Sequence, residues 1–179
     1  SPTPPELSRL SFRIRTLDAM ASWKEIEAAA PELAGRARAA FDAHKHKLLA
    51  TLRRDGSPRI SGIEATFADG ELWLGMMPGS RKALDLRHDP RLALHSASLD
   101  PPEDPTTWPG DAKLAGRAVE VDDPALKQRF AGGGGQPDEP HLFRVDITEL
   151  VHTRVGNPAD HLVIELWQPG RDVRRMQRR

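Results

Sequence analysis

Three short runs of strand-forming residues follow one another near the start of the chain, and an Asp-Gly pair separates each run from the next. The runs are Lys47–Arg53, Arg59–Phe67 and Glu71–Met76, with Asp55-Gly56 and Asp69-Gly70 between them. Asp-Gly favours the tight turns of β-hairpins, because both residues tolerate a positive φ. The spacing therefore predicts a meander of three antiparallel strands, and the rest of the chain must be compatible with that sheet.

Further strand-like runs fill most of the remaining sequence. They are Arg91–Ala97, Lys113–Val121, His141–Leu150, Val151–Val155 and Leu162–Trp167. A small domain with this many strands is most economically closed into a barrel, because closure removes the exposed edges of an open sheet. We therefore predict a mainly β fold, a six- to seven-stranded antiparallel β-barrel with a few short peripheral helices.

The predicted helices are short and few compared with the predicted strands. Apolar spacing over residues 23–41, interrupted at Pro31, predicts two short helices, and residues 81–87 and 123–130 predict two more. The segment Asp100–Asp111 contains four prolines and is expected to be a long loop.

The length of 179 residues suits one domain with a substantial core. Residues 1–20 contain three prolines and no sustained period, so we predict an N-terminal extension followed by a single domain over residues 21–179. The Arg171–Arg179 tail carries five arginines and is expected to be solvated, with a contact to a cofactor or a partner subunit as the alternative.

Charge and cysteine content exclude several classes of function. The 26 Lys and Arg residues balance the 26 Asp and Glu residues, so no general attraction to nucleic acid or to a membrane surface is expected. The absence of cysteine excludes thiolate catalysis and fits a reducing compartment. No apolar run approaches the roughly 20 residues of a spanning helix, and we expect a cytoplasmic protein. The histidines show no zinc or iron spacing, so no metal site is predicted.

The segment Gly79–Ala83 places two adjacent cations, Arg81 and Lys82, at the start of a predicted helix. Unpaired N–H groups already make a helix N-terminus positive, so cations there are unfavourable unless an anion is bound. A phosphate at this position would reverse the penalty. The alternative is a solvated basic turn that pairs with Asp85 or Glu71.

The region from Lys47 to Val121 resembles the pyridoxamine 5'-phosphate oxidase-like family of flavin-binding split barrels. The matching segments are Leu49-Ala50-Thr51-Leu52, Asp55-Gly56-Ser57-Pro58, Gly79-Ser80-Arg81-Lys82-Ala83, Asp89-Pro90-Arg91 and Gly116-Arg117-Ala118. The third segment is the most specific of them. The resemblance implies that the predicted barrel is a split barrel and that it binds a flavin.

By this resemblance, Arg81 and Lys82 bind the flavin phosphate. Ser80 would be the N-cap of the helix, and its hydroxyl would either accept from the N3 amide or face the phosphate. Gly62 fits a strand that lies along the flavin ring, since a residue without a Cβ lets a flat ring approach; a bulge or bend is the alternative. The remaining cofactor-binding residues implied by the resemblance are Ser61, Ile63, Glu64, Gly75 and Met76.

The resemblance implies an FMN-dependent oxidoreductase that acts on a small organic substrate and forms a homodimer with the cofactor at the interface. The flavin itself exchanges the hydride, so no catalytic residue is predicted. Two departures indicate a different substrate from pyridoxamine phosphate: residues 167–179 lack the Arg-Leu-His-Asp-Arg type of signature, and residues 111–113 lack the expected glutamine. A deazaflavin-dependent reductase and a non-catalytic flavin- or haem-binding protein are the alternatives.

Overall fold

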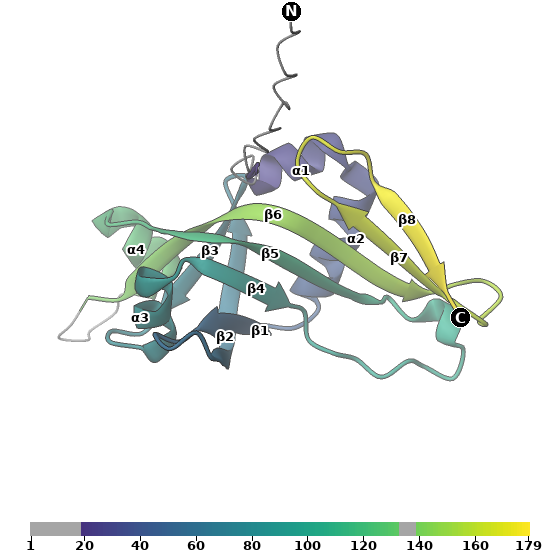
Figure 1. Cartoon of the computed structure of the whole chain (residues 1–179), viewed down its shortest axis with the longest axis horizontal. Helices are drawn as coiled ribbons and strands as arrows, with labels where there is room; N and C mark the ends of the chain where they lie inside the picture. Colours follow the sequence, from purple (N-terminus) through teal and green to yellow (C-terminus); the bar gives the residue numbers. More distant parts are fainter. Residues whose placement is uncertain (1–18, 133–138) are drawn as a thin grey trace, which may run out of the picture.

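A computed structural model describes residues 19–132 and 139–179 (Figure 1). Within these residues, eight antiparallel strands form one sheet in the order β3-β2-β1-β4-β5-β6-β7-β8, and β3 also pairs with β6. This pairing closes six strands into a barrel, from which β7 and β8 extend. The strands are β1 (His46–Leu52), β2 (Pro58–Ala68), β3 (Glu71–Met76), β4 (Arg91–His95), β5 (Asp111–Glu120), β6 (His141–Val155), β7 (Leu162–Trp167) and β8 (Arg174–Arg178). The predicted mainly β barrel is confirmed.

The meander turns have the backbone that their sequences predict. In the β2–β3 turn, Asp69 and Gly70 both have positive φ, at 55° and 76°. In the β1–β2 turn, Gly56 has φ 82°. Positive φ at both central residues is the requirement of the hairpin turn that matches the twist of the strands.

Four short helices accompany the barrel in the described part of the chain. They are α1 (Trp23–Ala29), α2 (Pro31–Asp42), α3 (Arg81–His88) and α4 (Pro124–Phe130), with a 3-10 turn, η1, at Pro105–Thr107. A capping box starts α1: the Glu25 N–H donates to the Ser22 hydroxyl, and the Glu25 carboxylate accepts from the Ser22 N–H. Pro31 occupies the first turn of α2, where its missing N–H costs nothing. The two predicted N-terminal helices are confirmed.

The core fills the barrel and continues under α1 and α2. Trp23 of α1 and Phe41 of α2 meet Phe67 of β2, with ring centroids 4.6 and 5.5 Å apart. On the barrel side, inward-facing residues such as Leu49 and Leu94 have no exposed surface. Alternate positions on β1 and β4 are buried, which is the period that the strand predictions used.

Strand β6 is continuous, whereas the sequence predicts two strands that meet at Leu150. The register with β5 shifts between Ala115 and Gly116, which is a β-bulge. Thr148 of β6 has no partner at this bulge, so the core-facing positions change from Val145 and Ile147 before it to Leu150 after it. The break in apolar alternation therefore marks a bulge and not a strand end.

The arginine-rich C-terminus is partly different from the prediction. Its side chains are exposed, as expected of a solvated tail, but residues Arg174–Arg178 form edge strand β8 on β7. Positive charge on an edge strand opposes pairing with other sheets. No helix in the described residues is long and apolar enough to cross a membrane.

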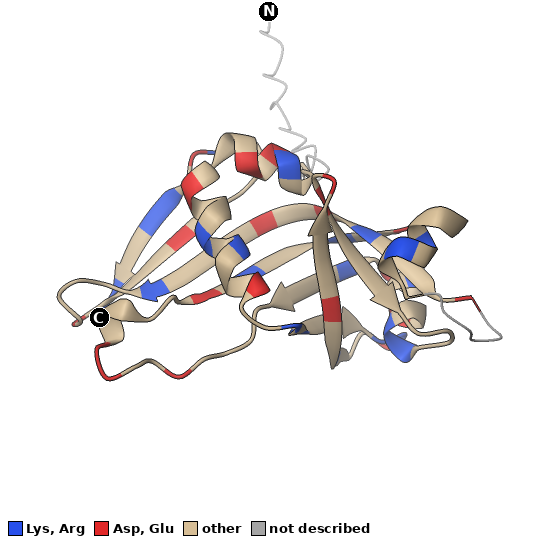
Figure 2. Ribbon diagram, turned by 180° about the vertical axis from the view of Figure 1, so that it is seen from behind, with Lys and Arg blue, Asp and Glu red and all other residues tan. Residues whose placement is uncertain are grey.

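Helices α3 and α4 lie near each other at the left end of the view in Figure 1, while β7 and β8 lie at the right end. Positive and negative residues are interspersed along α1 and α2 and over the sheet (Figure 2), as the balanced composition predicts. Of the predicted N-terminal extension, residues 1–20, all but Ala19 and Met20 lie outside the described residues.

Candidate cofactor site

A short turn connects β3 to α3 and sets the start of that helix. Gly79 has φ 65°, a conformation that favours glycine, and Ser80 is the N-cap with extended backbone. The Ser80 side chain makes no capping hydrogen bond. Its Oγ is buried and has no hydrogen-bond partner in the part of the chain that the structure describes. Of the two roles predicted for this hydroxyl, capping is therefore not observed.

A side-chain network at the start of β6 holds this turn. The Gly79 N–H donates to Nε2 of His141 at 3.1 Å. Arg87 of α3 donates from two nitrogens to the Glu120 carboxylate at 2.7 to 3.1 Å, and its guanidinium lowers the pKa of Glu120. Nδ1 of His141 lies 3.6 Å from the same carboxylate. The turn is thus fixed to β6 by a histidine that the sequence analysis did not single out.

A groove of about 390 Å³ runs from β2 across the end of β3 to the end of α4. Its size falls within the ~300–1,000 Å³ of small-ligand sites. Six of the nine predicted cofactor-binding residues line it: Gly62, Ile63, Glu64, Gly75, Met76 and Lys82. It also contains residues that the sequence analysis did not predict, namely His46, Thr66, Met77, Phe130, Ala131 and Gly132.

The two glycines of the groove have different surroundings. No heavy atom lies within 4 Å of the position that a Cβ on Gly62 would take, so the space beside this strand is open. A Cβ on Gly75 would instead collide with the Phe130 carbonyl oxygen and lie 2.7 Å from Cα of Ala131. Gly62 therefore fits the predicted close approach of a flat ring, whereas Gly75 allows α4 to pack on β3.

Lys82 extends from α3 to the wall of the groove. Its Nζ donates to the Gly62 carbonyl at 2.9 Å. At the other end of the groove, the Phe130 ring stacks on Trp73 with centroids 5.0 Å apart, which fixes the end of α4. The groove is thus lined by residues of β1, β2, β3, α3 and α4.

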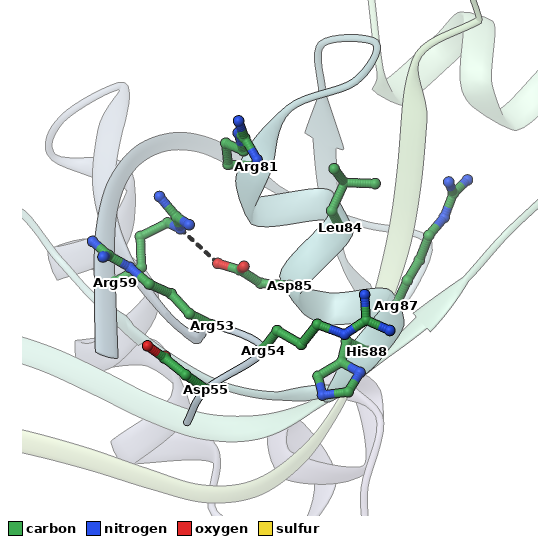
Figure 3. Close-up of a pocket in the computed structure, with 9 residues that line it drawn as sticks. All are labelled: Arg53, Arg54, Asp55, Arg59, Arg81, Leu84, Asp85, Arg87 and His88. Carbon is green, nitrogen blue, oxygen red and sulfur yellow. Dashed lines mark hydrogen bonds and ion pairs between the residues drawn. The ribbon is translucent and has the colours of Figure 1, made fainter. Parts of the chain in front are cut away.

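Arg81 lies on the other side of α3 and lines a separate cavity of about 680 Å³ (Figure 3). Arg59, at the start of β2, lines the same cavity and pairs with Asp85 of α3 at 2.6 Å. The structure therefore does not bring Arg81 and Lys82 into one hollow. Ser61, which alternates with Gly62 along β2, lines neither hollow. The ion pair with Asp85 or Glu71 that the alternative interpretation of Arg81 and Lys82 required is absent among the described residues.

Metal binding finds no support in residues 19–132 and 139–179. No group of three or more His, Asp or Glu side chains is placed to hold an ion. The polar side chains that line the groove are those of His46, Glu64, Thr66 and Lys82.

Comparison with known structures shows the same fold in proteins of low sequence identity. PhzG from Burkholderia lata 383, solved with tetrahydrophenazine-1-carboxylic acid, aligns with a TM-score of 0.57 and 14% identity over 88% of this chain and 93% of PhzG. A heme binding protein from Mycobacterium smegmatis aligns with a TM-score of 0.53 and 17% identity over 80% of this chain and 57% of that one. General Stress Protein 26 from Bacillus anthracis str. Sterne aligns with a TM-score of 0.51 and 14% identity over 66% of this chain and 91% of that one. No curated protein matches the sequence.

The model of the family described as pyridoxamine 5'-phosphate oxidase matches residues 33–155, from α2 to the end of β6. The match includes all six barrel strands, the turn before α3 and the groove between β2 and α4. By fold, by the Gly79–Ala83 segment and by this match, the chain belongs to the pyridoxamine 5'-phosphate oxidase family.

Proposed function

We propose that the protein is a flavin-dependent oxidoreductase that binds FMN in the groove and acts on a small organic substrate other than pyridoxamine phosphate. The observation that carries the proposal is the buried, unpartnered hydroxyl of Ser80 at the N-terminus of α3. A hydroxyl and helix N–H groups beside Lys82 suit a phosphate monoester. The open space over Gly62 supports the binding of a flat flavin ring in the groove.

Residues of the groove and of the turn before α3 would bind the two ends of FMN. Ser80 and Lys82 would hold the phosphate, and the backbone at Gly62 would face the ring. Met76 and Met77 offer apolar surface that excludes water from the ring. A bound flavin supplies a centre that accepts or donates hydride, so the chain need only bind and orient both reactants.

Two alternatives share much of this site. A deazaflavin carries the same kind of phosphate and would use the same residues. A heme binding protein from Mycobacterium smegmatis has the same fold, and His46, whose side chain is 72% exposed in the groove, is the residue that would ligate a haem iron here. The phosphate-compatible turn before α3 favours a flavin over haem.

Titration with each cofactor tests the proposal. We expect FMN to bind with one site per chain, with quenching of flavin fluorescence and a flavin absorption spectrum that co-elutes with the protein. Riboflavin, which lacks the phosphate, should bind at least tenfold more weakly if the phosphate site is used. Binding of hemin with a Soret band, together with no binding of FMN or deazaflavin, would contradict the proposal.

We also propose that the protein is a homodimer. The outer face of β2, β1 and β4 carries Ile60 and Leu48, which are 72% and 48% exposed. Ala50 pairs with Ile60 and with Ala93, so these residues form one apolar row across the three strands. Soluble monomers rarely leave such a sheet face uncovered, and a second copy is the commonest partner. The face adjoins Gly62, so a second copy would lie at the edge of the groove.

Substitution of Ile60 by glutamate should dissociate the dimer, because it buries a charge in an apolar contact. We expect light scattering to give the mass of a dimer for the parent protein and a monomer for Ile60→Glu at the same concentration. Met20→Glu is the matched control, since Met20 is 47% exposed next to α1 and should leave the mass unchanged. A parent protein that is monomeric would refute the proposed dimer.

A further inference from the structure

The side chain of His141 connects the two ends of the turn between β3 and α3. As the first residue of β6, His141 is the Cα partner of Met76, which ends β3 and lines the groove. Its Nε2 also accepts from the N–H of Gly79 at 3.1 Å, one residue before the N-cap Ser80. The imidazole is 12% exposed, so it is largely buried beside this turn. His141 therefore sets where the first turn of α3 begins relative to the groove.

The hydrogen bonds of this imidazole determine which nitrogen carries its proton. The N–H of Gly79 can only donate, so Nε2 must accept, and the proton of the neutral ring is assigned to Nδ1. Nδ1 lies 3.6 Å from Oε1 of Glu120, whose carboxylate attracts an N–H. Arg87 lies 3.3 Å from Nδ1, but its nitrogens already donate to Glu120 at 2.7 to 3.1 Å. The neutral ring with its proton on Nδ1 thus suits the observed contacts.

A second proton on the imidazole removes the bond to the turn. Both ring nitrogens are then donors, so the Nε2–H faces the N–H of Gly79 and no hydrogen bond joins them. Glu120 attracts the charged ring and Arg87 repels it, but neither side chain can restore the bond to Gly79. Histidine takes up its second proton between about pH 5 and pH 8, so the turn should loosen toward the acidic end of this range. The charged residues that share a hollow with His141 are Arg87, Glu120, Asp122, Lys127 and Glu139.

We propose that His141 is a positioning residue of the phosphate site, and that its neutral form holds Gly79 and Ser80 where FMN binds most tightly. The inference rests on the proposed function and extends it to a pH-dependent affinity for the cofactor. Gly79 has φ 65°, so its backbone sets the direction in which the chain enters α3. Ser80 follows directly, and its buried Oγ has no partner among the described residues. One hydrogen bond accounts for roughly three- to tenfold in an equilibrium, and FMN affinity should fall by this factor when His141 is protonated.

Fluorescence titration of the full chain with FMN at about pH 8 and about pH 5.5 tests the proposal. His141→Gln keeps an acceptor oxygen near the place of Nε2 but does not titrate, so at the higher pH it should bind FMN as the parent does. At the lower pH the parent should bind roughly three- to tenfold more weakly than His141→Gln. The two proteins are compared at the same pH, because a phosphate monoester itself takes up a proton at about pH 6. The matched control is His88→Gln, which removes an exposed histidine at the other end of α3 and should follow the parent at both pH values.

Hydrogen exchange in the cofactor-free protein tests the same bond without FMN. At about pH 5.5 the Gly79 amide should exchange faster in the parent than in His141→Gln, and at about pH 8 the two rates should be equal. His141→Ala offers no acceptor to this amide, so its Gly79 should exchange fast at both pH values while the circular dichroism spectrum stays unchanged.

The two measurements separate this inference from the proposed function. Equal FMN affinities and equal Gly79 exchange in the parent and His141→Gln at both pH values would overturn the inference and leave the proposed function standing. Weaker FMN binding by His141→Gln at both pH values would show a purely structural role and would also overturn it. Absence of FMN binding at either pH, with Gly79 exchange that still differs at the acidic pH, would refute the proposed function and retain the role of His141 in holding the turn.

Discussion

Replacement of both Arg81 and Lys82 by alanine should weaken FMN binding by about 2–5 kcal/mol, or roughly 30- to 5,000-fold, because each charge-assisted bond to a phosphate contributes about 1.5–3 kcal/mol. We expect the two residues to contribute unequally to this loss of affinity. Lys82 lines the groove, whereas Arg81 lines the cavity on the other side of α3. We therefore expect Lys82→Ala alone to lose the larger share. Fluorescence titration with FMN measures all three variants.

The matched control for this loss is Arg53→Ala/Arg54→Ala, which also removes two positive charges near α3 but none from the groove. Its affinity for FMN should equal that of the parent. Stability should change little in the Lys82 variant, since the bond from Nζ to the Gly62 carbonyl is exposed. Unchanged FMN affinity in Arg81→Ala/Lys82→Ala would refute the assigned phosphate site.

Local signals predicted most of the barrel. The Asp-Gly turns and the alternation on β1 to β3 depend on residues that are close in sequence, and the structure has both. The β6 bulge was not predicted, because it arises from a register shift against β5. Strand β8 was not predicted either, because its arginines pair through the backbone with β7 and their side chains give no apolar period.

Part of the site follows the prediction. Arg81 and Lys82 line different hollows, and the reason is helical geometry. Arg81 and Lys82 are adjacent in sequence, but successive helix residues differ by about 100° in direction, so their side chains leave α3 on different sides. The family resemblance implied that Gly75 is a cofactor-binding residue; in the structure it lines the groove and also allows α4 to pack on β3. That contact joins residues 55 positions apart, and nothing local in the sequence indicates it. Glu64 and Thr66 share one face of β2 with Gly62, and strand periodicity can predict that these three residues lie together.

The largest loss of stability should come from Arg59→Met, at about 2–4 kcal/mol. The Asp85 carboxylate is 8% exposed, and Arg59 is the cation that compensates its charge. Removal of Arg59 leaves a buried carboxylate with only the Thr51 hydroxyl, which donates to it at 2.8 Å. The expected loss of stability is smaller than the cost of breaking a fully buried ion pair, because the Arg59 side chain is 24% exposed. Urea unfolding at neutral pH measures the change.

Two comparisons test whether the unpaired Asp85 carboxylate causes the loss of stability in Arg59→Met. Arg59→Met/Asp85→Leu removes both charges and should recover most of the loss, because no unpaired carboxylate remains. Arg87→Met breaks a pair whose side chains are 47% and 34% exposed, and it should cost less than about 1 kcal/mol. Equal losses in Arg59→Met and Arg87→Met would contradict the argument. Since Asp85 also binds Thr51 of β1, this ion pair fixes α3 on the barrel, and Arg59→Met should loosen the helix whose first turn forms the phosphate site.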